Sequence, residues 1–288
     1  MAKPNEILDP TLDTVFFMLA NEKYINDFLK PLCLSVARLS AEEVAEISII
    51  DPRIPKNSPN ESQGIVDVLM RTCMGTTVHI EIQRRYFKNI NVRTNVQHSK
   101  LHGSQIDVGF EYSKVHRTIT LLISKSRLFE NEEYFCRYVM ANSLTGQIFD
   151  DSSEIYALVL SQLPKESDDT DVWVWGKFFK ARTEEELDML ARDNPIIQRA
   201  VAVLKDLSKD EVVRWQAERE MIYQLDQIDR EATVREEGIE IGVLRTAVKA
   251  INLGLDDATI AAIADISTEH VRALRAKNEE ANREGGLM

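Results

Sequence analysis

Hydrophobic and polar residues alternate in the middle of the chain, and this pattern predicts the strands of a sheet. The alternation is clearest in residues 65–73 and 77–84, which flank a short turn at residues 74–76. Because successive side chains on a strand point to opposite faces, the two segments are expected to pair as a hairpin with one strongly apolar face. The other segments with strand-like patterns are residues 47–50, 119–123, 134–142 and 154–163.

Apolar residues recur at helical spacing before and after these strands. The pattern predicts one N-terminal helix that begins at Asp13 and stops near Pro31, and a second helix over residues 92–110 that ends at Gly109. The remaining helical predictions are residues 184–237, 245–252, 256–264 and 267–277, with Ser267 as the N-cap of the last helix.

Two carboxylates, Asp67 and Glu81, lie within the strand patterns of the hairpin. Burying an isolated carboxylate is so costly that the group needs a cation, hydrogen-bond donors or a proton. Alternation puts both carboxylates on the less apolar face of the hairpin, and Gln83 points the same way as Glu81. A Mg²⁺ ion suits such oxygen ligands. A structural ion pair with Arg71 or Arg84 would also compensate the charge, and the residues leave both interpretations open.

Charge is unevenly distributed along the chain. The net charge is -12, yet residues 84–127 carry 9 Lys and Arg against 2 Asp and Glu. Positive charge directly after Glu81 is what a phosphodiester substrate requires. A solvated charged face balanced by the acidic remainder would have the same composition, and this alternative also stays open.

No apolar run approaches the ~20 residues that a membrane-spanning helix needs, and the first residues contain no hydrophobic signal region. We therefore expect a soluble, cytoplasmic protein without a membrane partner.

The order Asp67, a hairpin, then Glu81, Ile82 and Gln83 resembles the motif of the recombination-promoting nuclease and transposase family. This family belongs to the PD-(D/E)XK nuclease superfamily. The resemblance extends over roughly residues 5–235. Its other matching segments are residues 8–10 with 13–16, residues 109–112 before 119–123, and residues 163–165.

The resemblance implies a restriction-endonuclease-like α/β core, with a central mixed sheet flanked by helices, followed by a helical C-terminal region. It implies Mg²⁺-dependent hydrolysis of DNA, with Mn²⁺ as a substitute, in recombination, mobile elements or phage defence. A nuclease that cuts both strands often needs two active sites, so a homo-oligomer, favoured as a dimer, is expected. The domains are expected at residues 1–180 for the core, 181–238 for a helical extension and 239–288 for a helix-turn-helix-like tail.

Residue roles also follow from the resemblance. Asp67 and Glu81 correspond to metal ligands, with the backbone carbonyl of Ile82 as a third. Gln83 stands where the wider superfamily has lysine, and it is expected to orient the attacking water without adding a charge. The residues expected to bind the substrate are Arg84, Arg85 and Arg93.

The sequence leaves alternatives open for the function of the chain and for several residues. The chain is either a nuclease or a catalytically inactive DNA-binding or protein-interaction module, and the tail serves either DNA contact or self-association. Asp13 is expected to be an exposed or capping residue of the first helix rather than a further acid of the site. His98 and His102 are four residues apart and are expected on a helix surface.

Overall fold

The computed structural model describes residues 7–53, 67–106, 111–130 and 133–285. The chain divides into two compact units, Met1–Glu220 and Met221–Met288. Each unit is described by itself.

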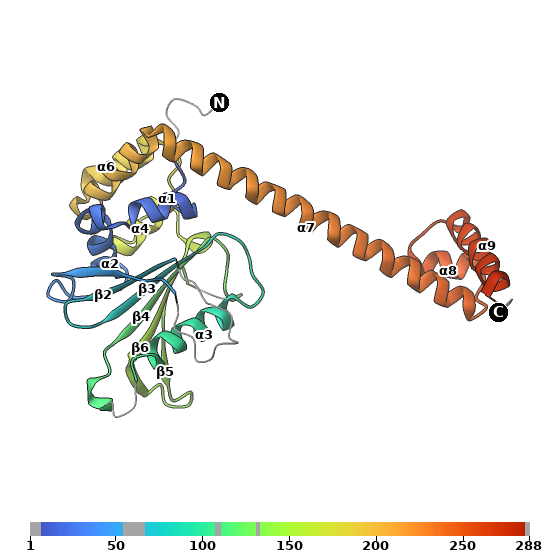
Figure 1. The fold of residues 1–288 in the computed structure, drawn as a ribbon, viewed down its shortest axis with the longest axis horizontal. Coiled ribbons are helices and arrows are strands. Elements are labelled where there is room, and N and C mark those ends of the chain that lie inside the picture. The colour runs from blue at the N-terminus through green and yellow to red at the C-terminus, as the bar shows by residue number, and fades with distance from the viewer. Residues whose placement is uncertain (1–6, 54–66, 107–110, 131–132, 286–288) are drawn as a thin grey trace. The chain divides into compact units, whose positions relative to one another are not determined.

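A mixed sheet of 6 strands, in the order β1-β2-β3-β4-β6-β5, forms the centre of the first unit (Figure 1). β3 runs parallel to β4, and β4 runs parallel to β6. The outer pairs β1–β2, β2–β3 and β5–β6 are antiparallel. The strands are β1 Ile47–Ile50, β2 Val68–Thr72, β3 Thr77–Gln83, β4 Thr118–Ser124, β5 Phe135–Ala141 and β6 Ile148–Val159.

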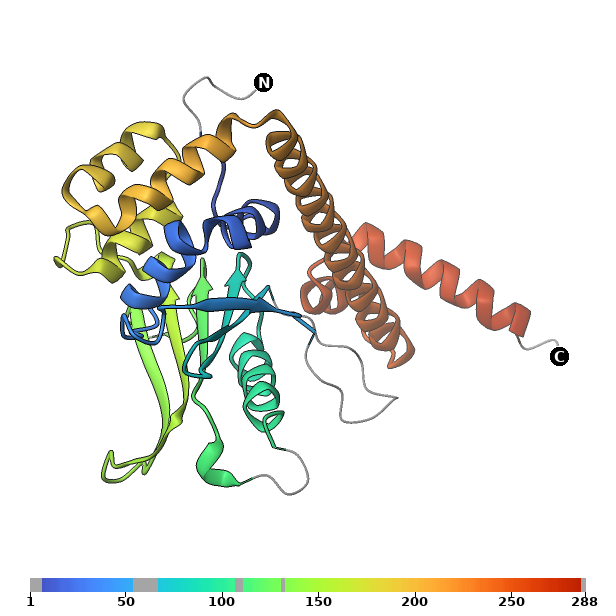
Figure 2. The ribbon, with the colours of Figure 1, turned by 60° about the vertical axis from the view of Figure 1, so that its left-hand side comes forward.

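Helices cover both faces of this sheet: α3 lies on one face, and α1, α2, α4 and α6 lie on the other (Figure 2). The expected restriction-endonuclease-like arrangement, a mixed sheet flanked by helices and followed by a helical C-terminal region, is therefore confirmed. The α-helices are α1 Asp13–Leu19, α2 Lys30–Ser35, α3 Ile90–Gly103, α4 Asp171–Lys180, α5 Glu184–Asp193, α6 Pro195–Lys209, α7 Glu211–Asn252, α8 Asp257–Ala264 and α9 Thr268–Gly285. Shorter helical turns occur at Glu22–Tyr24, Ile25–Leu29, Tyr112–Lys114 and Leu160–Gln162.

The two faces of the sheet differ in chemistry. Alternate side chains of β3 and β4, such as Ile80 and Leu121, join the main hydrophobic core under α1, α2, α4 and α6. Trp175 and Phe178 of α4 are fully buried in that core. The opposite face, under α3, is lined largely by polar residues of the same strands, Thr77, His79, Glu81, Thr118 and Thr120, all buried. Because packing on the apolar face stabilises the sheet, the opposite face can hold polar and charged side chains.

The expected hairpin forms between β2 and β3, with Val68 opposite Ile80. Its turn contains Gly75 at φ +85°, a left-handed conformation that suits glycine. A Cβ on Gly75 would also lie 2.6 Å from the His116 ring. Residues 65 and 66 of the predicted strand lie outside the described residues.

Three predicted helix boundaries are wrong. The N-terminal helix is interrupted after α1, because Asn21 accepts a hydrogen bond from Lys23 N and caps a new turn. Pro31 lies in the first turn of α2, where its missing N–H costs nothing. α3 ends at Gly103, and the expected end at Gly109 lies outside the described residues. Residues 245–252 are no separate helix, because they continue α7.

The second unit has a small apolar core between the end of α7, α8 and α9, built around Ala247, Ile260 and Val271. α8 ends in a left-handed Asp265. The hydroxyl of Ser267 accepts a hydrogen bond from His270 N, as expected for the N-cap of α9.

Candidate active site

Asp67 and Glu81 approach each other at the open end of the β2–β3 hairpin. Asp67 lies one residue before β2, and the register that pairs Val68 with Ile80 continues to place Asp67 opposite Glu81. Asp67 Oδ2 accepts a hydrogen bond of 2.7 Å from the backbone N–H of Ile82. The structure therefore brings Asp67, Glu81 and the Ile82 main chain together.

The Glu81 side chain is only 3% exposed, and both of its oxygens have partners. Oε1 lies 2.8 Å from Nη2 of Arg93, which comes from α3. Oε2 lies 3.3 Å from Nε2 of His79 on the same strand. The compensating cation is thus Arg93, and the sequence-based candidates Arg71 and Arg84 are wrong for Glu81.

The surroundings of Asp67 disfavour its charged form. Burial, together with the negative charge of Glu81, raises the pKa of Asp67 to about 7, although the Ile82 hydrogen bond opposes the shift. Asp13 contributes to the same repulsion. The pKa of Asp13 is itself raised, mainly by burial and by Glu220 and to a smaller extent by Glu81. Asp13 is the first residue of α1, as expected, yet its charge also acts on the carboxylate pair.

The basic residues after the motif have different surroundings. Gln83 is the last residue of β3, and its Nε2 donates a hydrogen bond of 2.8 Å to the carbonyl of Arg85. Because β3 ends there, strand alternation does not place Arg85 on the Glu81 face. The Arg84 guanidinium lies 3.6 Å from carboxylate oxygens of both Asp9 and Glu220.

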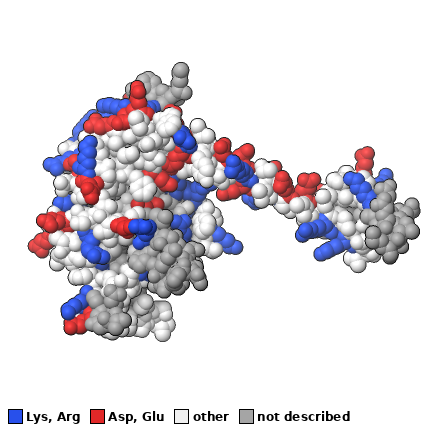
Figure 3. Space-filling model, in the orientation of Figure 1, with Lys and Arg blue, Asp and Glu red and all other residues white. Residues whose placement is uncertain are grey.

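Many cations of the basic block are paired with acids from elsewhere in the chain. Lys125 lies 2.7 Å from Asp9, and Arg117 contacts Glu43 at 2.9 Å and Glu154 at 2.6 Å. On the visible surface Lys, Arg, Asp and Glu are interspersed (Figure 3). Part of the basic block is therefore an ion-paired surface, in line with the alternative of a charged face that is balanced by acidic residues.

A buried polar layer beside Glu81 was not predicted from the sequence. His98 of α3 is 3% exposed, so its expected place on a helix surface is wrong. Its Nδ1 lies 2.9 Å from Thr120 Oγ1, and its Nε2 lies 2.8 Å from Ser153 Oγ. Burial lowers the pKa of His98 to about 4, so the ring is neutral. The sequence pattern that could have revealed this layer is the alternation of threonines in the otherwise apolar β4, which indicates a polar sheet face.

The donor set fits a hard divalent cation in its chemistry. It consists of two largely buried carboxylates and a main-chain carbonyl, all oxygen ligands of the kind that Mg²⁺ prefers. A cation beside Asp67 would also favour its charged form, which burial and the negative charge of Glu81 disfavour. Within the described ranges, no group of three or more His, Cys, Asp and Glu side chains is placed to hold a metal. Such an ion would therefore also need oxygens from the main chain, water or substrate.

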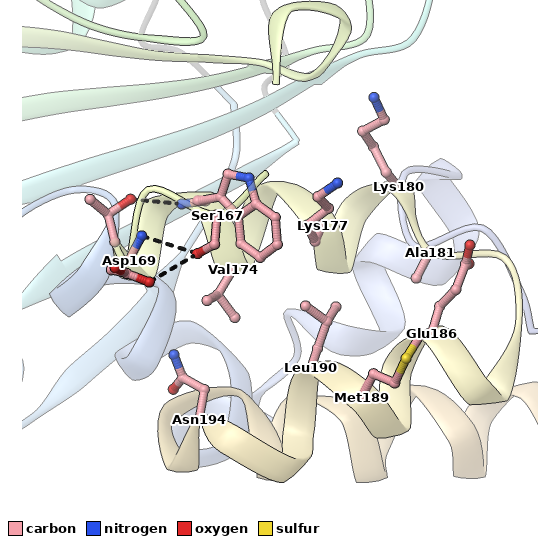
Figure 4. Close-up of a pocket in the computed structure, with 12 residues that line it drawn as sticks. Ser167, Asp169, Val174, Lys177, Lys180, Ala181, Glu186, Met189, Leu190 and Asn194 are labelled. Carbon is pink, nitrogen blue, oxygen red and sulfur yellow. Dashed lines mark hydrogen bonds between the residues drawn. The ribbon is translucent and has the colours of Figure 1, made fainter. Parts of the chain in front are cut away.

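A separate pocket of about 780 Å³ lies between α4 and α5 (Figure 4). Trp173, Lys177 and Lys180 of α4 and Leu190 of α5 contribute to its lining. Lys177 Nζ lies 4.8 Å from the centre of the Trp173 ring. Neither Asp67 nor Glu81 lines this pocket, so we do not assign it to the candidate active site.

The chain matches the model of a known protein family. A family model described as PD-(D/E)XK nuclease family transposase matches residues 10–233, which include Asp67, Glu81 and the whole sheet. No curated protein and no solved structure matches the chain significantly. Among the described residues, no helix is long and apolar enough to cross a membrane.

Proposed function

Because the chain belongs to the PD-(D/E)XK nuclease family transposases, we propose that it is a metal-dependent deoxyribonuclease that hydrolyses DNA phosphodiester bonds. Family membership supports a nuclease-like function with DNA as the substrate. The metal dependence and the residue roles below are our proposal. Its setting would be recombination, mobile elements or phage defence, in the cytoplasm.

One observation carries the proposal: the hairpin register places Asp67 opposite Glu81, and Ile82 N–H holds the Asp67 carboxylate in place. Asp67, Glu81 and the Ile82 carbonyl would hold Mg²⁺ or Mn²⁺. When bound, the ion stabilises negative charge on the reacting phosphate and makes water more acidic. The hairpin register and the Ile82 N–H hydrogen bond fix the carboxylates in position before the substrate arrives, so little reorganisation is needed.

The neighbouring side chains would position the substrate and water. Gln83, beside Glu81 at the end of β3, would orient the attacking water through its amide. Arg93 is 44% exposed and already lies at the carboxylate pair, so it would contact a phosphate oxygen there. Arg85 would bind the DNA backbone, whereas Arg84 would act mainly through its ion pairs with Asp9 and Glu220.

A nuclease assay on supercoiled and linear DNA, with Mg²⁺ or Mn²⁺, tests the proposal. Asp67→Ala should abolish cleavage and retain the fold. Asp51→Ala, which removes an exposed carboxylate that pairs with the nearby Arg53, is the matched control and should cleave like wild type. Wild-type protein that binds DNA but does not cleave it under any of these conditions would favour the inactive DNA-binding module.

We also propose that the protein is a dimer through α7. Met221, Leu225 and Ile228 recur at helical spacing on one face of α7, and each is 49–61% exposed. An exposed apolar stripe of this kind is suited to pairing with a second copy of the helix. Light scattering should give a dimer for wild type and a monomer for Leu225→Glu. Tyr223→Glu, on the opposite side of the helix, should remain a dimer.

A further inference from the structure

A continuous chain of hydrogen-bonding groups leads from Glu81 on β3 across the polar face of the sheet to Ser153 on β6. Glu81 Oε2 lies 3.3 Å from His79 Nε2, and His79 Nδ1 lies 3.3 Å from Thr120 Oγ1. The same Thr120 oxygen lies 2.9 Å from His98 Nδ1. His98 Nε2 in turn lies 2.8 Å from Ser153 Oγ. His79 and Thr120 are 0% exposed, so solvent cannot replace any partner in the middle of the chain.

When both imidazole rings are neutral, the donor and acceptor properties of these groups fix the direction of each hydrogen bond in this hydrogen-bond chain. A carboxylate only accepts hydrogen bonds, so His79 Nε2 must carry the proton. His79 Nδ1 is then an acceptor, and it takes the hydroxyl proton of Thr120. Thr120 has one hydroxyl proton, so its oxygen must accept from His98 Nδ1–H. His98 Nε2 is left as an acceptor for the hydroxyl of Ser153.

We propose that His79 and His98 are positioning residues that hold the Glu81 carboxylate in a single orientation through this one-directional chain. The inference rests on the proposed function, since Glu81 matters to catalysis only if it binds the metal. In the chain, His79 is the Nε2–H tautomer and His98 is the Nδ1–H tautomer. Hydrogen bonds that all point the same way polarise and strengthen one another.

The two oxygens of Glu81 consequently have different roles. Oε2 is held by a fully buried neighbour whose ring cannot leave without breaking the chain. Oε1 faces Arg93, a half-exposed side chain that can move to the substrate. Oε1 is therefore the oxygen offered to the metal, and His79 fixes the direction in which it points. Outer partners that orient a ligand in this way typically change metal affinity 10- to 100-fold when they are removed.

Thr120 is the best point at which to test the chain, because its hydroxyl joins the two histidines. Thr120→Val keeps the shape and removes the hydroxyl, whereas Thr120→Ser keeps the hydroxyl. Thr118→Val is a matched control on the same face of β4. The Thr118 hydroxyl is also fully buried and lies 3.0 Å from His102 Nδ1, outside the chain.

Two measurements are needed. Long-range ¹H–¹⁵N correlation spectra of the metal-free protein should show Nε2–H at His79 and Nδ1–H at His98. Titration calorimetry with Mg²⁺ should show an affinity about tenfold lower for Thr120→Val, and wild-type affinity for Thr120→Ser and Thr118→Val. In Thr120→Val the single tautomer at His98 should be lost, because its remaining partner, the Ser153 hydroxyl, can donate or accept. His79 should stay Nε2–H, because the Glu81 carboxylate only accepts. If Thr120→Val does not fold, Ser153→Ala removes the last donor of the chain at its partly exposed end. It should leave both tautomers unchanged and lower Mg²⁺ affinity by a smaller factor.

An Nδ1–H tautomer at His79 would overturn the inference. So would wild-type Mg²⁺ affinity in folded Thr120→Val, or in Ser153→Ala if that variant has to be used. Wild-type protein that neither binds Mg²⁺ nor cleaves DNA would instead overturn the proposed function, whatever the tautomers are. The two failures are therefore distinguishable.

Discussion

Arg93 Nη2 and Glu81 Oε1 form an ion pair of 2.8 Å that joins α3 to β3 at the candidate active site. The guanidinium is 44% exposed, whereas the carboxylate is 3% exposed. The pair thus has a movable cation at the rim and a fixed anion below it. A divalent metal and this guanidinium would both compensate the charge on the same carboxylate oxygen.

Removal of the guanidinium should therefore destabilise the metal-free protein much more than the protein with bound metal. Arg93→Ala leaves a buried carboxylate without its cation, and we expect a loss of about 1–3 kcal/mol, less than for a fully buried pair because Arg93 is half exposed. Thermal unfolding with and without millimolar Mg²⁺ measures this, and Mg²⁺ should restore most of the loss. Arg199→Ala, which removes a more exposed cation 3.6 Å from Asp27, is the control and should show no Mg²⁺-dependent difference.

Asp67 should make the metal-free protein less stable as pH rises. Its pKa is raised to about 7 in the fold, because of burial and the charge of Glu81, from an ordinary value of 3.8. The folded state therefore binds the proton more tightly than the unfolded state, and this stabilisation is complete below about pH 4 and is lost as pH rises towards 7. Asp67→Asn keeps the acceptor for Ile82 N–H and cannot ionise.

Denaturant unfolding of metal-free protein between pH 4 and 8 measures this effect. Asp67→Asn should gain stability over wild type progressively up to about pH 7, by at most ~4 kcal/mol. Saturating Mg²⁺ should reverse the order, because only wild type keeps the full ligand set. A stability difference between the two proteins that does not vary with pH would show that the Asp67 carboxyl does not have a raised pKa in the fold.

Gln83 should tolerate replacement by lysine. If the glutamine only orients water, an ammonium at the same place would add favourable charge near the phosphate, so Gln83→Lys should cleave at least as fast as wild type. Gln83→Ala should lower kcat, with little change in DNA affinity. Single-turnover cleavage together with DNA-binding measurements separates the two effects, and a Gln83→Lys protein as slow as Gln83→Ala would argue against the water-orienting role.

The turn that sets the register of the two carboxylates should depend on Gly75. Gly75→Ala must place a Cβ at φ +85° and displace the His116 ring, which lies 2.6 Å from the Cβ position. Gly146→Ala, in the β5–β6 turn at φ +73°, has no atom within 4 Å of the new Cβ and costs only the backbone strain. Chemical denaturation should show that Gly75→Ala loses about 1 kcal/mol more than Gly146→Ala, because crowding adds to the strain. Equal losses would mean that His116 moves aside freely.

Local patterns in the sequence were sufficient for the hairpin and the carboxylate pair. Asp67 and Glu81 are joined by one short turn, and side chains alternate strictly along strands, so their common face follows from counting residues. The helix ends were less well determined. A proline or a glycine permits more than one local structure, and whether Pro31 begins or ends a helix depends on what the neighbouring residues pack against.

Only the tertiary structure decided which groups surround the carboxylates. Arg93 and His98 come from α3, Thr120 from β4 and Ser153 from β6, and the sheet order β3-β4-β6 brings them together beside Glu81. The sequence by itself determined that two acids share one face of a hairpin, because that is a property of neighbouring residues. The ion pair and the hydrogen-bond chain depend on parallel strand pairing and on the polar face of α3, which long-range packing of the apolar core selects.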